Sequence, residues 1–181
     1  MSDERLIRQA APTLAGIKTG SLFPCAYTDR EKLLRQVRGL NRRLAAKGLC
    51  LVPLRWGEGN ALLYLFRPSR LEADLAGEEA RALLRELGYA DAGRQRCLCE
   101  LARRLRSRRD FPHEIGIFLS YPPEDVRGFI EHQGKDCKAV GCWKVYGDAE
   151  RAEKRFDAYK RCTANYLSRF AAGASVEALT V

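Results

Sequence analysis

The sequence predicts a single globular domain, residues 1–181, of the α/β or α+β class, with helices packed around a roughly five-stranded mixed sheet. Apolar runs of strand length are interspersed with segments whose leucines recur at helical spacing, which is typical of mixed folds. Hydrophobic residues make up 46% of the chain and charged residues 30%, as in ordinary globular proteins. A chain of this length buries roughly two thirds of its unfolded surface, so one sizeable core is expected.

The strands are expected where apolar residues run between turn signals. Gly and Asn in residues 56–60 indicate a hairpin between two of these strands. Pro24 places the first strand at a sheet edge, and Pro53 indicates an edge or a bulge in the second, because proline cannot donate to a ladder. The expected strands are 21–27, 49–55, 61–67, 114–121 and 140–146.

Helices are expected where capping signals precede periodic apolar residues. Capping-box spacing at residues 28–31 begins a helix that Gly48 stops, and the same spacing recurs at residues 69–72. The helices between 69 and 109 form an insertion that covers one face or end of the sheet. The remaining expected helices are a short or frayed one at 1–10, then 78–87, 91–106, one after the prolines at 122–123 that stops at Gly134, and 148–172.

Composition argues against a membrane protein and a disulfide scaffold. No apolar run approaches the roughly 20 residues of a membrane span, and the polar start MSDERLIRQ lacks the apolar stretch of a signal peptide. The seven cysteines are dispersed and odd in number, which favours a reducing compartment. We therefore expect a cytoplasmic protein with no membrane partner. Cys137 and Cys142 lack a second pair of ligands, so no metal site is predicted.

The net charge of +9, from 32 Lys and Arg against 23 Asp and Glu, indicates attraction to phosphates or other anions. The helix expected at 91–106 carries the strongest basic patch, which lacks interleaved aromatic residues and matches no nucleic-acid reader motif. Nucleic acid is therefore a disfavoured partner, although the arginines could bind one or meet an acidic protein. The arginines are Arg94, Arg96, Arg103, Arg104, Arg106, Arg108 and Arg109.

Residues 11–21 form a run of small residues with Lys18 between Gly16 and Gly20. Glycines and hydroxyls let a backbone approach an anion closely, and a lysine can neutralise it. The alternative is a tight turn with an exposed lysine. The segment is not a Walker A loop, because its Gly-Lys-Ser/Thr would have to follow a strand and open a helix.

The apolar run 114–121 is expected to be a buried central strand that brings its two ends to a pocket. His113 precedes this run, and Tyr121 and Asp125 follow it. Lys144 and Tyr146 share one face of the strand expected at 140–146. If the strand is parallel, its carboxyl end is where α/β folds place ligands. Together with Lys18, these residues are the predicted ligand-binding set.

Two classes of function stay open, and the sequence identifies neither a cofactor nor an oligomeric state. The first is a domain that binds or acts on an anionic small molecule through the predicted pocket. The second is a non-enzymatic adaptor or regulator that uses the arginine-rich helices. We favour the first, since polar and aromatic residues gather at strand ends. If the protein is an enzyme, the catalytic candidates are His113 as an acid or base and Cys162 as a nucleophile near basic residues. The alternative for His113 is a hydrogen bond to backbone, and the alternative for Cys162 is inert packing of its thiol.

The segments FPHEIGIFLSYPPEDVRGFI, GCWKVYGD and FDAYKRC resemble a bacterial family of unknown function numbered 3793, found mainly in Firmicutes. The likeness extends to APTLAGIKTGSLF at 11–23, LLYLFRPSRL at 62–71 and LGY at 87–89. Two departures are Ser120, where the family pattern suggests glycine, and Cys142, where it suggests a large residue. The resemblance implies a small, intracellular, single-domain bacterial protein and assigns no catalytic role.

Overall fold

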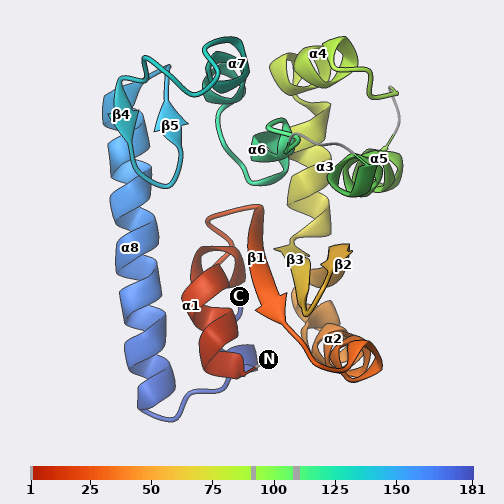
Figure 1. The fold of residues 1–181 in the computed structure, drawn as a ribbon. Coiled ribbons are helices and arrows are strands. Elements are labelled where there is room, and N and C mark those ends of the chain that lie inside the picture. The colour runs from red at the N-terminus through yellow and green to blue at the C-terminus, as the bar shows by residue number, and fades with distance from the viewer. Residues whose placement is uncertain (1, 91–92, 108–110) are drawn as a thin grey trace. The chain divides into compact units, whose positions relative to one another are not determined.

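The computed structural model describes residues 2–90, 93–107 and 111–181, and the chain divides into two compact units (Figure 1). Unit 1 consists of residues 1–69 and 159–181, and unit 2 of residues 70–158. The expected α+β content is present. The expectation of one domain stays a prediction, because cooperative unfolding is its test.

Unit 1 is built on a three-stranded antiparallel sheet in the order β1-β3-β2. Its strands are β1 (Gly20–Ala26), β2 (Cys50–Gly57) and β3 (Asn60–Phe66). The predicted hairpin between β2 and β3 is confirmed, and β1 lies at an edge as Pro24 indicated. The register shifts between Pro53 and Arg55, which confirms the expected irregularity in β2.

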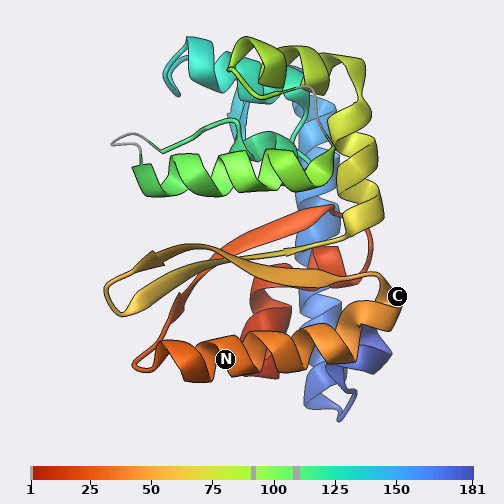
Figure 2. The same ribbon diagram turned by 90° about the vertical axis from the view of Figure 1, so that its right-hand side faces the viewer.

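Helices cover one face of this sheet. α1 (Asp3–Leu14), α2 (Arg30–Leu44), the second part of α8 (Ala149–Ala171) and α9 (Val176–Leu179) contribute to one core, and the 3-10 turn Ala45–Lys47 follows α2. Figure 2 shows α2 running along the sheet. The core takes alternate residues of β3, because successive strand side chains point to opposite faces: Ala61, Leu63 and Leu65.

Two boundaries in unit 1 differ from expectation. α1 continues to Leu14, through Pro12, beyond the short or frayed helix that the sequence predicted at residues 1–10. Burial explains the difference, since Ala10, Ala11 and Leu14 all contribute to the core and small residues let the helix pack closely. Asp29 caps α2 by accepting a hydrogen bond from the Lys32 amide at 3.0 Å, one residue after the predicted start.

The side chain of Arg67 joins three parts of unit 1 by donating hydrogen bonds to their backbone carbonyls: the end of α1, the end of the 3-10 turn and the C-terminal residue. Its Nε donates to the carbonyl of Thr13 at 2.8 Å and its Nη1 to that of Lys47 at 3.2 Å. Its Nη2 donates to the carbonyls of Leu14 at 2.6 Å and Val181 at 2.7 Å. These carbonyls lie at helix ends and at the chain end, and one guanidinium fork donates to all of them. The carbonyls of Thr13 and Leu14 also accept hydrogen bonds from the N–H groups of Gly16 and Val181.

Side chains also cover the two outer strands. The Asn41 amide on α2 donates to the Leu51 carbonyl at 2.9 Å and accepts from the Leu51 N–H at 2.7 Å. Arg5 on α1 donates to the Pro24 carbonyl at 3.0 Å. Both contacts occupy outward-facing backbone groups that would otherwise offer an edge for pairing with another chain.

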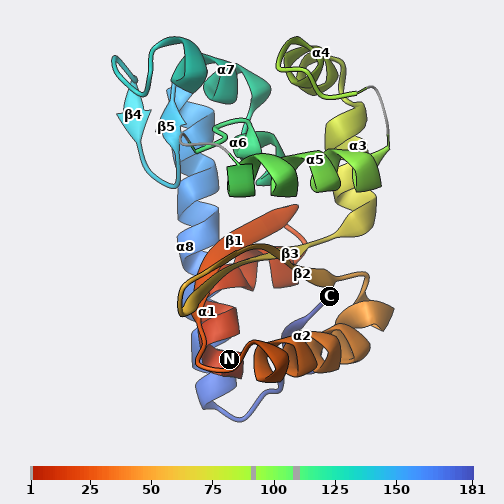
Figure 3. The same ribbon diagram turned by 45° about the vertical axis from the view of Figure 1, so that its right-hand side comes forward.

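Unit 2 is mainly helical (Figure 3). It contains the residues of α3 (Pro68–Ala76) from Arg70, then α4 (Glu78–Glu86), α5 (Arg94–Ser107), α6 (Ile115–Phe118) and α7 (Pro123–Glu131). A short hairpin, β4 (Ala139–Val140) and β5 (Lys144–Val145), precedes α8. The helices expected between 69 and 109 are confirmed, although the Asp91 start expected for α5 lies outside the described residues.

The expected central strand at 114–121 is wrong, because residues 115–118 form the short helix α6. The segment is buried as expected, and an apolar run buried on all sides does not separate a strand from a helical turn. Its amides bond locally, with Leu119 N–H donating to the Ile115 carbonyl at 3.1 Å. Gly116 permits this packing, since a Cβ there would clash with Val126.

The expected single strand at 140–146 is also wrong. The chain reverses within it, and the Gly141 N–H donates to the Trp143 carbonyl at 3.0 Å to close the turn. Gly141 lies directly against the Phe156 ring of α8, where a side chain at residue 141 would not fit. The five-stranded mixed sheet is therefore replaced by a three-stranded sheet and a two-stranded hairpin, both antiparallel.

A buried polar cluster joins three segments of unit 2. Arg104 on α5 donates to Glu114 at 3.1 Å and to the Leu87 carbonyl at 2.7 Å, and the Tyr89 hydroxyl donates to Glu114 at 3.1 Å. The Arg104 guanidinium also lies 4.2 Å from the Tyr89 ring centroid. Burial and the neighbouring Glu114 charge raise the pKa of Tyr89, so the hydroxyl stays a donor. The cluster satisfies charges that would be costly alone.

Candidate functional site

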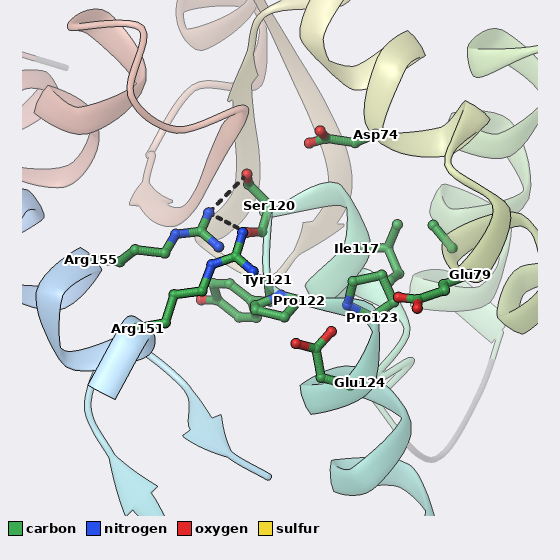
Figure 4. A pocket seen from close by; sticks show the side chains of 11 residues that line it. Asp74, Glu79, Ile117, Ser120, Tyr121, Pro122, Pro123, Glu124, Arg151 and Arg155 are labelled. Carbon is green, nitrogen blue, oxygen red and sulfur yellow. Dashed lines mark hydrogen bonds between the residues drawn. The ribbon is translucent and has the colours of Figure 1, made fainter. Parts of the chain in front are cut away.

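A pocket of about 320 Å³ lies within unit 2, lined by residues of α3, α4, α6, α7 and α8 (Figure 4). Its volume is at the lower end of the range for small-molecule sites. The residues 120–124, Ser-Tyr-Pro-Pro-Glu, form one wall, which runs from the segment after α6 into the first turn of α7. The lining combines two arginines, three carboxylates and an apolar stretch, so we consider the charges in turn.

Arg151 and Arg155 lie one turn apart on α8, and both line the pocket. Arg155 donates from Nη2 to the Ser120 carbonyl at 2.9 Å, and its guanidinium carbon lies 5.5 Å from the Trp143 ring centroid. Arg151 is exposed, and its guanidinium forms no hydrogen bond or ion pair with the described residues. One arginine is thus fixed by the wall, while the other is available to a ligand.

Three carboxylates line the same pocket from other helices. Glu79 lies in the first turn of α4, Glu124 in the first turn of α7, and Asp74 on α3. Figure 4 shows Asp74 and Glu79 on the side away from the two arginines. Neither Glu79 nor Glu124 forms an ion pair within the described part of the chain. The pocket therefore offers uncompensated charges of both signs.

Tyr121 is the residue of the predicted ligand set that lines the pocket. Its ring stacks on Trp143 with centroids 4.7 Å apart, and its hydroxyl donates to the Cys142 carbonyl at 3.2 Å. The preceding residue, Ser120, has φ of 65°, a conformation that glycine adopts more easily. The expectation of glycine at residue 120 therefore has a structural reason. The side chain of Arg155 donates a hydrogen bond to the carbonyl of Ser120 in this conformation.

Asp125 and Tyr146 hold the β4–β5 hairpin and do not line the pocket. The buried Asp125 carboxylate accepts hydrogen bonds of 2.7 Å from Trp143 Nε1, from the Tyr146 N–H and from the Gly147 N–H. The Tyr146 ring packs against Gly128, where a side chain would not fit, and its hydroxyl donates to the Lys135 carbonyl at 2.9 Å. These three hydrogen bonds attach the hairpin to α7 through the Asp125 carboxylate, so Asp125 has a structural role.

His113 and Lys144 meet at Phe129, and neither lines the pocket. The His113 ring centroid lies 4.7 Å from that of Phe129, and the Lys144 ammonium lies 5.9 Å from the same centroid. Lys144 also donates to the Gly134 carbonyl at 2.6 Å. The structure therefore brings these two residues together at a surface cluster apart from the pocket lining.

Lys18 and Cys162 belong to unit 1. The Lys18 ammonium lies 5.8 Å from the Tyr159 ring centroid. The backbone N–H of Lys18 donates to the Pro12 carbonyl at 3.0 Å in the turn after α1. Cys162 is half-buried against the core of unit 1, and burial raises the pKa of its thiol. A protonated thiol is a poor nucleophile, so this environment favours a packing role.

The arginine-rich helix α5 is partly neutralised within unit 2. Arg103 binds Glu100 at 2.7 Å, Arg104 is buried in its polar cluster, and Arg94 lies 3.6 Å from Glu72. Hydrogen bonds from Arg103, together with Arg104, lower the pKa of Glu100 to about 2. Arg108 and Arg109 of the predicted patch lie outside the described residues.

In residues 2–90, 93–107 and 111–181, no group of three or more His, Cys, Asp or Glu side chains could hold a metal ion. Cys142 lies in the turn of the β4–β5 hairpin, whereas Cys137 precedes β4, at the open end of the hairpin. No helix of the described chain has both the length and the apolar character needed to cross a bilayer.

The pocket residues that sequence reasoning missed are Arg151, Arg155, Glu79 and Glu124. Two signals were present: the arginines recur four residues apart after the Asp148 cap, and Glu124 follows two prolines. Glu124 had a sufficient explanation in the positive end of α7. Only the packing of α4, α7 and α8 shows that these charges line one pocket.

The fold and the site define an α+β protein with a small antiparallel sheet in one unit and a pocket of mixed charge in the other. The chain belongs to the family described as "Protein of unknown function (DUF3793)", whose model matches residues 6–180. The resemblance noted in the sequence is thereby confirmed. Comparisons with curated proteins and with solved structures gave no match.

Proposed function

We propose that unit 2 binds a small organic molecule through an anionic group that Arg151 contacts in the pocket. The observation that carries this proposal is the guanidinium of Arg151, which lines the pocket without a hydrogen bond or ion pair among the described residues. Arginine presents a planar fork of donors that matches carboxylate and phosphate groups. A ligand would supply the missing acceptor.

Arg155 supports the same function by shaping the wall. Its hydrogen bond to Ser120 and its position over the Trp143 ring hold the guanidinium in place one turn from Arg151. A positive charge fixed before binding adds to the attraction without a further entropic penalty. This proposal retains the expected anionic small molecule and moves its site from the predicted residues to the two arginines of α8.

Nuclear magnetic resonance titration tests the proposal with two probes, butyrate and inorganic phosphate. We expect at least one probe to shift the Arg151 side-chain resonance and the amides of residues 120–124. The variant Arg151→Gln should weaken this binding about tenfold, the scale of one charge-assisted contact. Arg161→Gln is the matched control, because Arg161 is exposed on the same helix and does not line the pocket.

The two probes separate carboxylate from phosphate ligands. A response to butyrate alone assigns a carboxylate, and a response to phosphate alone assigns a phosphate group. Equal binding in wild type and Arg151→Gln, or no shift at residues 120–124 with either probe, overturns the proposed function. Thermal melting of each variant establishes that the fold is intact.

A further inference from the structure

We infer that the ligand of this pocket is a zwitterion, with an amine bound by the carboxylates that line the pocket together with the arginines. The inference rests on the proposed function and adds the second charged group of the ligand. Its basis is the coexistence of Arg151 with Glu79 and Glu124, three side chains that line one pocket and lack ion pairs with described residues. A ligand with only a negative charge would leave both glutamates uncompensated.

The charge balance of the lining supports a ligand with two charged ends. Two arginines and three carboxylates line the pocket, with Asp74 and Glu79 on the side away from the arginines (Figure 4), so the lining is not electropositive as a whole. A ligand with a single negative charge would be attracted by the arginines and repelled by Glu79 and Glu124. A ligand that also carries an ammonium group converts that repulsion into attraction.

The surface between the charged ends is apolar. Figure 4 shows Ile117, Pro122 and Pro123 between the arginines and Glu79. The two prolines have no N–H groups, so this part of the wall offers no backbone donor to an anion. A short aliphatic chain suits such a surface. The chemical class is therefore a small amino acid whose amine and carboxylate lie at opposite ends of an aliphatic chain.

A series of ω-amino acids from glycine to 6-aminohexanoate tests the inference by the same titration. Butyrate and butylamine serve as partners of 4-aminobutyrate that each lack one charge. We expect one member of the series to bind at least about tenfold more tightly than its matched carboxylic acid, because a second charge-assisted contact is made. The optimal chain length would measure the spacing between the two charged ends.

Glu79→Gln should remove most of the difference in affinity between the amino acid and its matched carboxylic acid. The affinity for butyrate should be unchanged or improved. Glu78→Gln is the matched control, since Glu78 lies in the same first turn of α4 and does not line the pocket. Both substitutions remove one negative charge in the first turn of α4, so we expect similar effects on helix stability. A difference between the two variants therefore reports contact with the ligand.

The outcomes separate the two proposals. If butyrate binds through Arg151 and no amino acid binds more tightly than its matched acid, the zwitterion inference is overturned and the proposed function stands. An equal loss of affinity for the amino acid in Glu78→Gln and Glu79→Gln also overturns the inference. If butylamine binds as tightly as 4-aminobutyrate, the anionic contact itself is wrong. If no probe binds, both proposals are overturned.

Discussion

Arg67, Glu114 and Asp125 show that polar residues in the family-like segments have structural tasks at the scale of single side chains. Arg67 satisfies four carbonyls, Glu114 joins Arg104 to Tyr89, and Asp125 accepts three hydrogen bonds from the hairpin. Each contact has its partner within the same unit. Arg151 differs because it lines a pocket and has no such partner among the described residues.

Arg67→Ala should lower the free energy of unfolding by about 3 kcal/mol, because it removes four hydrogen bonds made by one partly buried guanidinium. Arg67→Lys should restore only part of this loss, since an ammonium group lacks the planar fork. Urea unfolding measures both effects. Arg70→Ala is the control, as Arg70 is exposed in the same 62–71 segment and should change stability by less than about 0.5 kcal/mol. An equal loss in both alanine variants would contradict the assigned role of Arg67.

Cys162 should react slowly with iodoacetamide, because burial raises the pKa of its thiol and limits access. Cys99 and Cys142 are exposed and provide internal references. We expect alkylation of Cys162 at pH 8 to be at least about tenfold slower than alkylation of Cys142. Mass spectrometry of peptides sampled over time measures the rates. Alkylation of Cys162 ahead of both exposed thiols would instead indicate an activated nucleophile.

At the scale of elements, Arg43 connects three helices of unit 1. Its guanidinium on α2 binds Asp3 at the start of α1, with Nη2 and Oδ2 2.7 Å apart, and it also binds Glu177 on α9. These contacts join segments that are distant in sequence. The hydrogen bond from Arg43 lowers the pKa of Glu177 to about 2, from an ordinary value of 4.5.

This shift predicts a pH-dependent contribution to stability. A lowered folded-state pKa stabilises the fold above about pH 4.5, and the contribution disappears as the pH falls towards 2. We expect Glu177→Gln to lower the melting temperature at pH 6 by about 1–3 °C, because the pair is partly exposed and screened by solvent. The difference from wild type should vanish near pH 2.

Thermal melts at several pH values measure that difference. Glu153→Gln is the control, since Glu153 is exposed and has no ion pair with the described residues. It should have no pH-dependent effect over the same range. A difference for Glu177→Gln that stays constant from pH 6 to pH 2 would contradict the assigned ion pair.

At the scale of the whole molecule, α8 supplies buried residues to both units. Ala152 and Phe156 belong to unit 2, whereas Tyr159 and Tyr166 belong to unit 1. Half of this helix without its packing partners would be a short isolated helix, which is marginal in water. Loss of structure in one unit should therefore destabilise the part of α8 that serves the other.

We accordingly expect one cooperative unfolding transition for the chain. The two tryptophans allow a direct test, because Trp56 lies in unit 1 and Trp143 in unit 2. Urea unfolding of the single-tryptophan variants Trp143→Phe and Trp56→Phe should give coincident fluorescence and circular-dichroism midpoints within each variant. Separate transitions for the two probes would show that the units unfold independently and that the single-domain prediction is wrong.

Local signals predicted much of the fold. Pro24 and Pro53 indicated the positions of two strands, residues 56–60 a hairpin, and Asp148 the start of α8. The prediction failed for residues 114–121 and 140–146, where burial or alternation suited more than one backbone conformation. Of the candidate site, Tyr121 lines the pocket, and the arginines and glutamates beside it were missed.

The sequence by itself determined the elements whose signals are local: helix caps, proline-marked edges and the hairpin between β2 and β3. It also determined membership of the family, since the likeness follows the order of residues along the chain. Only the tertiary structure decided that Arg151, Glu79 and Glu124 line one pocket. The physical reason is that a charged side chain on a helix surface has the same local pattern whether it faces water or a pocket formed by distant helices.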